Sequence, residues 1–167
     1  MPTLVIANSK LRKAEMYMTD RHRIREMDLE ADLQQVCKIW LNGIKETAPP
    51  LTSGEAWESL RDSFIKETQA ANERYVCEEN GTIRGFITAG LPHNKNYLLA
   101  LYIDSGSRGK GIGTKLLDRL RVTYRYLIGH VYEQNLKAIE FYKNRGFEVS
   151  GKKKCRHINH IKRKITW

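Results

Sequence analysis

The sequence contains few cysteines and no long hydrophobic run. Its three cysteines, Cys37, Cys77 and Cys155, are odd in number and widely spaced, and none belongs to a C-x-x-C pair. This pattern argues against a disulfide framework or a zinc knuckle and favours reduced, mostly buried thiols. The only early apolar run covers residues 4–7, and no later run approaches the length that crosses a membrane. We therefore expect a cytoplasmic protein without a membrane partner.

Positive charge, by contrast, is in excess. Lys and Arg outnumber Asp and Glu 29 to 19, which is a formal net charge of +10. Such an excess favours anionic ligands, which include phosphorylated cofactors, nucleic acid, ribosomes and acidic proteins. The basic runs at 152–154 and 162–164 lack an interleaved aromatic platform and are more typical of solvated surface. These runs add only slight support for nucleic-acid binding.

Length and composition indicate a single domain. The chain has 167 residues, of which 41% are hydrophobic, and this is enough apolar material for one buried core. Residues 1–21 show no sustained period, and we interpret them as an N-terminal extension. The domain then spans residues 22–167.

Hydrophobic periodicity within the domain predicts alternating strands and helices. The first half contains a strand at 22–27, a helix capped by Asp28, a second helix capped by Ser53 after Pro49-Pro50, and a hairpin that turns at Asn80-Gly81. The second half contains a polar break at 92–96, a buried strand at 97–103, a glycine-rich loop leading into a helix, a strand at 127–132, a helix at 135–145 and two terminal strands. This order predicts an α/β (α+β) domain whose mixed, mostly antiparallel sheet of roughly six to seven strands is flanked by about four helices.

The junction between the buried strand and the following helix has the composition of an anion-binding site. Gly109, Gly111 and Gly113 let the backbone turn tightly and approach a ligand, while the free N–H groups of the helix start point at it. Arg108 and Lys110 add positive charge, so a diphosphate fits this loop. The Walker pattern would need Lys in place of Ile112, and the dinucleotide fingerprint would need Gly in place of Thr114.

The segment 108–113, Arg-Gly-Lys-Gly-Ile-Gly, resembles the R/Q-x-x-G-x-G/A signature of the GNAT superfamily of N-acetyltransferases, placed after a buried strand. A second block, 135–147, resembles the next element of that family, with Asn135, the small Ala138, Tyr142 and then Gly-Phe opening a strand. The resemblance covers residues 22–167 and is nearest to short bacterial members that acetylate proteins. It departs at Ser105-Gly106, where many relatives carry proline.

This resemblance implies acetyl-CoA as cosubstrate and no metal. It implies that the strands at 97–103 and 127–132 splay apart, with the pantetheine arm between them. The cofactor-binding residues it implies are Tyr102 and Ile103 through their backbone, Arg108, Gly109, Lys110, Gly111, Ile112, Gly113 and Thr114 in the loop, and Asn135, Ala138 and Tyr142 on the later helix.

The same resemblance makes Tyr142 the catalytic residue that faces the sulfur and stabilises the departing thiolate. Proton transfer from a phenol with a pKa near 10 to a thiolate near 8.5 is uphill by roughly 2 kcal/mol, so we expect hydrogen bonding to contribute at least as much as transfer. The Ile103 N–H is the expected oxyanion donor. The base stays open among a water chain, Glu46, Tyr97 and Glu133.

The Cys155-x-His157-x-x-His160 pattern places His160 on the opposite face of a strand from the other two, so a basic strand or loop is preferred to a metal site.

The expected reaction is acetyl transfer to a protein lysine, an N-terminal amine or a small amine, by a monomer or homodimer. The alternatives are a nucleic-acid or ribosome-binding module with a degenerate fold, which salt would weaken steeply, and a toxin-like acetylase of aminoacyl-tRNA.

Overall fold

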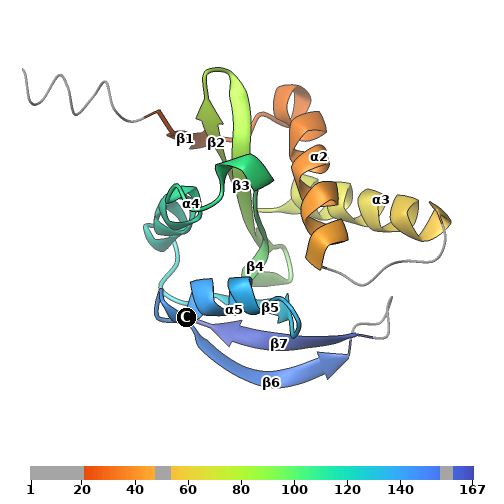
Figure 1. Cartoon of the computed structure of the whole chain (residues 1–167), viewed down its shortest axis with the longest axis vertical. Coiled ribbons are helices and arrows are strands. Elements are labelled where there is room, and N and C mark those ends of the chain that lie inside the picture. Colours follow the sequence, from red (N-terminus) through yellow and green to blue (C-terminus); the bar gives the residue numbers. More distant parts are fainter. Residues whose placement is uncertain (1–20, 48–53, 155–159) are drawn as a thin grey trace, which may run out of the picture.

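The structure is a computed structural model that describes residues 21–47, 54–154 and 160–167, with residues 54–57 described by their backbone alone. In chain order the elements are β1 (Arg23–Glu26), α2 (Leu29–Thr47), α3 (Gly54–Ala70), β2 (Glu73–Glu79), β3 (Thr82–Leu91), β4 (Asn94–Ile103), the 3-10 turn η1 (Ser105–Ser107), α4 (Ile112–Arg121), β5 (Ile128–Tyr132), α5 (Leu136–Lys143), β6 (Glu148–Lys154) and β7 (Ile161–Thr166) (Figure 1). The cap at Ser53, the break at Pro49-Pro50, and Cys155 and His157 lie outside the described residues.

All strands in the described part of the chain form one seven-stranded sheet in the order β1-β2-β3-β4-β5-β7-β6. Every neighbouring pair is antiparallel except β4 and β5, which are parallel. Figure 1 shows β2, β3 and β4 roughly vertical in the middle, whereas β5, β7 and β6 run across the lower part. The predicted mixed, mostly antiparallel α/β fold is confirmed.

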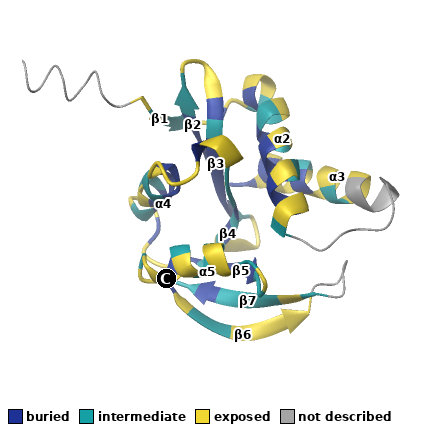
Figure 2. Ribbon diagram, in the orientation of Figure 1, coloured by how far each residue is buried: buried dark blue, intermediate teal, exposed yellow. Residues whose placement is uncertain are grey.

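Helices cover both faces of the first half of the sheet. Helices α2 and α3 pack on β3 from one side, which we call the α2 face, and α4 packs on β2, β3 and β4 from the other, which we call the α4 face. Helix α5 packs against β6. Figure 2 shows that the buried residues of α2 lie along its side toward β3. No helix of the described part of the chain is long and apolar enough to cross a membrane.

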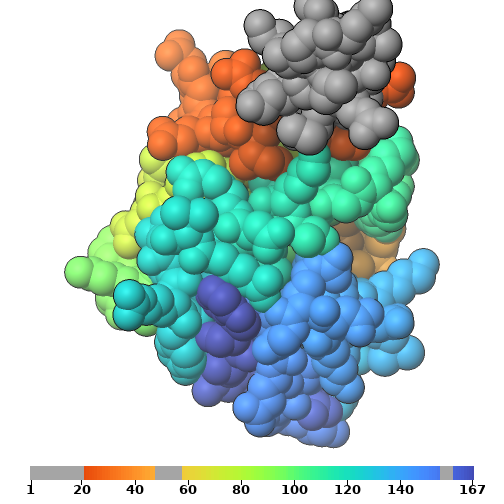
Figure 3. Space-filling model, turned by 90° about the vertical axis from the view of Figure 1, so that its left-hand side faces the viewer, coloured from red at the N-terminus to blue at the C-terminus, as the bar shows by residue number. Residues whose placement is uncertain are grey.

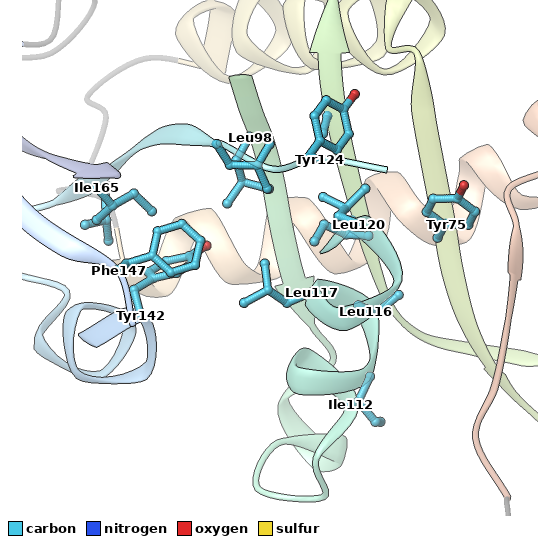
Figure 4. Packing of buried hydrophobic residues seen from close by; sticks show 14 of the residues in the cluster. Tyr75, Leu98, Ile112, Leu116, Leu117, Leu120, Tyr124, Tyr142, Phe147 and Ile165 are labelled. Atoms are coloured by element: carbon cyan, nitrogen blue, oxygen red, sulfur yellow. The ribbon is translucent and has the colours of Figure 1, made fainter. Parts of the chain in front are cut away.

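Each face has its own hydrophobic cluster. On the α4 face, Ile112, Leu116, Leu117 and Leu120 of α4 project toward the sheet, and the rings of Tyr142 and Phe147 lie close by (Figure 4). The α2 face has a smaller cluster, in which Trp40 of α2 stacks on Phe64 of α3 with ring centroids 4.5 Å apart. Burying aliphatic and aromatic side chains of this kind stabilises a domain by about 1.5–3 kcal/mol each, before the entropy cost of ordering.

The C-terminal residues close the α4 face beside α4. Figure 3 shows α4, the segment from α5 to β6 and the last residues of the chain side by side on this surface. The guanidinium of Arg121 in α4 lies 4.6 Å from the ring centroid of Trp167, and that ring lies 6.3 Å from Phe147. The end of β7 is thereby fixed to α4.

Local signals in the sequence placed several boundaries correctly. The Asp28 carboxylate accepts hydrogen bonds from the N–H groups of Glu30 and Ala31 at 2.9 and 3.1 Å, which is the predicted cap of α2. Asn80 and Gly81 have φ values of 51° and 74°, as the predicted type I′ hairpin turn requires.

The polar break predicted at 92–96 is too long. Residues Asn94 to Asn96 belong to β4, which pairs with β3 from Asn94 onward, and only Pro92 and His93 form the turn. Backbone pairing in a hairpin continues beyond the apolar residues because it does not depend on side-chain burial. The buried-strand pattern recognised only the part of β4 that the core covers.

Candidate active site

The loop between β4 and α4 holds two glycines in a conformation that other residues rarely adopt. Gly109 and Gly111 have φ values of 75° and 78°, and Gly111 is the residue that caps α4. A Cβ built on either glycine would have no atom within 4 Å. The loop is therefore open on its outer side, where a ligand can approach the backbone.

The start of α4 presents unused hydrogen-bond donors to this open side. The first helical bond runs from Lys115 N–H to Gly111 O at 3.1 Å, so the four N–H groups from Gly111 to Thr114 have no acceptor within the helix. They point along the helix axis together with its positive dipole end. Phosphate oxygens match this arrangement, and Lys110 lies exposed beside it.

Beyond the loop, β4 and β5 separate from each other. Within the described residues these strands pair at one position, Tyr97 with Ile128, whereas β5 pairs along its full length with β7. On its other edge β4 stays bonded to β3, and the Asp104 N–H donates to Arg84 O at 2.9 Å. Alternation in an antiparallel pair then turns the N–H and C=O groups of Ile103 and Leu101 away from β3, into the gap.

Tyr102 and Ile103 were both predicted to bind the cofactor through their backbone, but only the Ile103 backbone faces the gap. Tyr102 lies opposite Phe86 of β3, so its backbone groups face β3, and its contribution to the region is a ring stacked 5.9 Å from that of Phe86. The Ile103 backbone faces the gap, where its carbonyl accepts from Arg108 Nε at 3.3 Å. Ile103 thus has the orientation that the sequence-based hypothesis requires.

Arg108 also connects the loop to α2. Its guanidinium contacts the Glu46 carboxylate at 2.6 Å, and both side chains are almost half exposed. Glu46 is one of the proposed bases, but the ion pair commits its carboxylate to Arg108. The neighbouring Thr47 carbonyl accepts from Gln134 Nε2 at 3.3 Å, so the end of α2 reaches both the loop after β4 and the loop after β5.

Asn135 and Ala138 form the cap of α5. The Asn135 side-chain oxygen accepts the Ala138 N–H at 3.1 Å, which leaves the amide NH₂ of Asn135 available for other partners. Thr114 is also engaged, because its hydroxyl accepts from Arg145 Nε at 2.9 Å. Of the cofactor contacts implied for Thr114, the backbone N–H is the one that this arrangement leaves open.

Tyr142 lies buried where α5 meets α4. Its ring makes edge contacts with Phe141 and Phe147 at centroid distances of 5.2 and 5.1 Å. Burial, and then the nearby hydroxyl of Tyr102, raises the pKa of Tyr142 above its ordinary value. Its phenol therefore stays protonated and can act as a hydrogen-bond donor.

The absence of a side chain at Gly113 lets α4 and α5 approach each other closely. A Cβ at this position would lie 3.1 Å from Cε2 of Phe141, so a larger residue would push α5 away from α4. The third glycine of the loop therefore serves helix packing, while Gly109 and Gly111 serve backbone conformation.

A model of the acetyltransferase (GNAT) family matches residues 38–147. The chain belongs to the GNAT family. Among curated proteins, the peptidyl-lysine N-acetyltransferase YjaB of Escherichia coli is 40% identical over 125 residues, covering 71% of this chain and 78% of that protein. The peptidyl-lysine N-acetyltransferase YiaC of the same organism is 25% identical over 130 residues, covering 75% and 83%.

Solved structures agree with this family assignment. The solution structure of apo YjaB from Escherichia coli has a TM-score of 0.70 and 25% identity, covering 87% of this chain and 97% of that one. The structure of yncA from Salmonella typhimurium with its cofactor acetyl-CoA has a TM-score of 0.64 and 20% identity, covering 87% and 92%. The second likeness shows a shared GNAT fold. The chain is thus an enzyme of the GNAT N-acetyltransferase family.

The remaining base candidates of this GNAT domain lie near β5. Glu133 forms ion pairs with Lys152 at 3.0 Å and Arg163 at 3.4 Å, and the hydrogen bond from Lys152 lowers its carboxyl pKa further below neutrality. Such a carboxylate is a weak base. Tyr97 instead approaches His130, with 2.7 Å between Tyr97 Oη and His130 Nδ1.

His130 is the residue near the gap that sequence reasoning missed. It lies in β5 between Gly129 and Val131, and a lone histidine in an apolar strand gives no local sign of its partner. The partner is 33 residues earlier in the chain. Among the residues that the structure describes, no group of His, Cys, Asp and Glu side chains has the arrangement of a metal site.

Proposed function

We propose that this GNAT enzyme transfers the acetyl group of acetyl-CoA to a lysine amine of a protein, by direct attack of the amine on the thioester. The observation that carries the proposal is the junction between β4 and α4. Four N–H groups there, from Gly111 to Thr114, face an open surface at the mouth of the gap between β4 and β5. A ligand that consists of a diphosphate followed by a long, thin arm with amide groups would fit this loop and the gap below it.

The residues at the junction fit coenzyme A in charge and in space. The N–H groups at the start of α4 would hold the diphosphate, with Arg108 and Lys110 beside it. The pantetheine amides would pair with the Ile103 backbone as a strand pairs with its neighbour, and the Asn135 amide would donate to the same arm. A bound cofactor of this kind would supply an acetyl group activated as a thioester.

The chain's own groups would support attack without a covalent enzyme intermediate. The N–H groups of Ile103 and Leu101 both face the gap, and either can donate to the oxyanion that forms when the amine attacks. Tyr142 would donate to the thiolate. Because its pKa is raised, full proton transfer to a thiolate, whose conjugate thiol has an ordinary pKa near 8.5, is more uphill than for a free phenol, which favours stabilisation by hydrogen bonding.

The choice of a peptidyl lysine as acceptor is supported by the relatives. Both YjaB and YiaC are named as peptidyl-lysine N-acetyltransferases, and the chain covers 78% and 83% of their lengths. Small amines and N-terminal amines are the competing acceptors within the same chemistry.

A transfer assay tests this proposal. The protein is incubated with acetyl-CoA and peptides that carry one internal lysine and a blocked N-terminus, and free thiol and peptide mass are followed together. We expect thiol release matched by one added acetyl group on the lysine. Peptides with the lysine replaced by norleucine are the control. Transfer to spermidine or to free N-termini, with none to lysine, would contradict the proposed acceptor.

A further inference from the structure

A tyrosine and a histidine meet where β4 and β5 stop pairing. Tyr97 pairs with Ile128 where the two strands meet, and His130 follows two residues later on β5. Tyr97 Oη lies 2.7 Å from His130 Nδ1, and the ring centroids are 5.7 Å apart. The pair occupies the narrow end of the gap.

Both side chains are on the α2 face. Leu98 and Val131, the chain neighbours of Tyr97 and His130, belong to the cluster on the α4 face, and strand alternation turns the pair to the opposite side. That cluster, which includes Tyr142, fills the α4 side of the gap. An amine therefore has to approach from the α2 face, where the pair lies, with the group that stabilises the thiolate on the other side.

The pair is within reach of the reacting groups. Leu101, whose N–H faces the gap, is four residues farther along β4, which is a Cα span of about 13 Å. Strand side chains stand roughly perpendicular to the sheet, so the amine and bridging water would cover this span. At this distance the pair is placed to accept a proton from the amine and not to contact the thioester.

We propose that Tyr97 and His130 form a relay that removes the proton of the attacking amine, a role that rests on the function proposed above. As the nitrogen bonds to the thioester carbon and the C–S bond breaks, the N–H becomes acidic. Its proton passes to Tyr97 Oη, directly or through water, while the Tyr97 hydroxyl proton passes to His130 Nδ1. The resulting imidazolium then releases its proton to solvent.

The groups that face the pair set its starting protonation states, with His130 neutral and Tyr97 protonated. Burial is the main cause that lowers the pKa of His130, and positive charge adds to it from three lysines on β6 and β7, namely Lys153, Lys162 and Lys164. The imidazole is therefore neutral, and able to accept, to a lower pH than an ordinary histidine. Burial, and then the carboxylate of Glu67 on α3, raises the pKa of Tyr97, which keeps its hydroxyl protonated as the donor.

The pH dependence of kcat/KM tests the relay, with the lysine peptide and acetyl-CoA as substrates. In the unaltered enzyme kcat/KM should fall as the pH drops through the His130 pKa, below the ordinary value of about 6.5. His130→Gln should lower kcat/KM by about 100-fold and remove this acid limb, and Tyr97→Phe should lower it by about tenfold or more. The matched controls His93→Gln and Tyr126→Phe, at exposed positions, should keep both rate and limb.

A second variant moves the limb instead of removing it. Lys164→Gln takes away one positive charge near His130, so the histidine pKa rises and the acid limb shifts to higher pH. The same loss of charge at the exposed Lys38, in Lys38→Gln, should leave the limb in place. A merely structural pair would change unfolding midpoints without moving the limb.

Failure of the relay and failure of the proposed function give different results. Each variant is also titrated with acetyl-CoA by calorimetry. If His130→Gln binds acetyl-CoA normally and keeps both its rate and its acid limb, the relay is overturned while the function stands. If the unaltered enzyme neither binds acetyl-CoA nor modifies any amine, the function fails, and the relay fails with it.

Discussion

The end of the site that is suited to phosphate and the end that is suited to the amine are built from different parts of the chain. The phosphate end consists of backbone N–H groups from one continuous segment, Gly111 to Thr114, held by glycines with positive φ. The proposed amine end consists of the side chains of Tyr97 and His130 from β4 and β5, and Gly43 of α2 packs against Tyr102 farther along β4. Backbone donors tolerate changes in side-chain type, whereas a side-chain pair depends on the identity of both partners. The two ends should therefore respond differently to substitution.

The largest expected effect is at the phosphate end. Gly111→Asp places a non-glycine residue at a φ of 78°, which costs about 1–2 kcal/mol, and sets a carboxylate against the diphosphate. We expect affinity for acetyl-CoA, measured by calorimetry, to fall at least about 100-fold. Gly81→Asp is the matched control, since Gly81 has a φ of 74° and open space around it, but lies in the β2–β3 turn. An equal loss in the control would show that the effect is not local to the loop.

A smaller effect is expected at Tyr142, where a substitution should lower kcat without lowering the affinity for acetyl-CoA. Tyr142→Phe keeps the ring between Phe141 and Phe147 and removes only the hydroxyl. We expect acetyl-CoA affinity to change less than about twofold and kcat to fall about 10- to 100-fold, as for other lost donors to a developing anion. Tyr124→Phe, in the same buried cluster, is the control for packing. Equal losses of affinity and kcat would remove Tyr142 from the chemical step.

Packing between α2 and β4 should be sensitive to a single methyl group. Ala usually stabilises a helix over Gly by up to about 1 kcal/mol. In α2, however, a Cβ on Gly43 would lie 2.4 Å from Cδ1 of Tyr102. We expect Gly43→Ala to lower the free energy of unfolding by about 1–2 kcal/mol in urea titrations, because overpacking outweighs the helix preference. Gly106→Ala, whose Cβ would meet only Asp104 at 3.6 Å, should change stability little.

The smallest effect is expected where α2 contacts the phosphate loop. The Arg108–Glu46 ion pair is almost half exposed, and pairs of this kind contribute about 0–1 kcal/mol. Glu46→Gln frees Arg108 for the diphosphate and removes a nearby negative charge. We expect acetyl-CoA affinity to rise by up to about fivefold at low salt, with the gain shrinking as salt increases. Glu58→Gln, at an exposed position on α3, controls for net charge, and a matching gain there would exclude a specific role for the pair.

The same contrast explains what the sequence could predict. The glycine loop and the helix from Asn135 to Tyr142 are continuous segments whose conformation follows from local rules, so the helix start near Asn135 and the tight turns at Gly109 and Gly111 agree with expectation. Arg108 and Glu46 are 62 residues apart, and Tyr97 and His130 are 33 apart. Such contacts depend on the strand order and on where β4 and β5 separate. Tyr97 and Glu46 were candidates for the base by residue type, but their partners came only from the fold.

The most direct test of the central claim is calorimetric titration of the unaltered protein with acetyl-CoA, at low and at moderate salt. We expect saturable one-to-one binding at both, weakened by salt but not abolished, because the N–H groups at the start of α4 contribute alongside Arg108 and Lys110. Absence of binding, together with binding to RNA that falls steeply between the two salt concentrations, would contradict the account and favour a nucleic-acid-binding module on a GNAT fold.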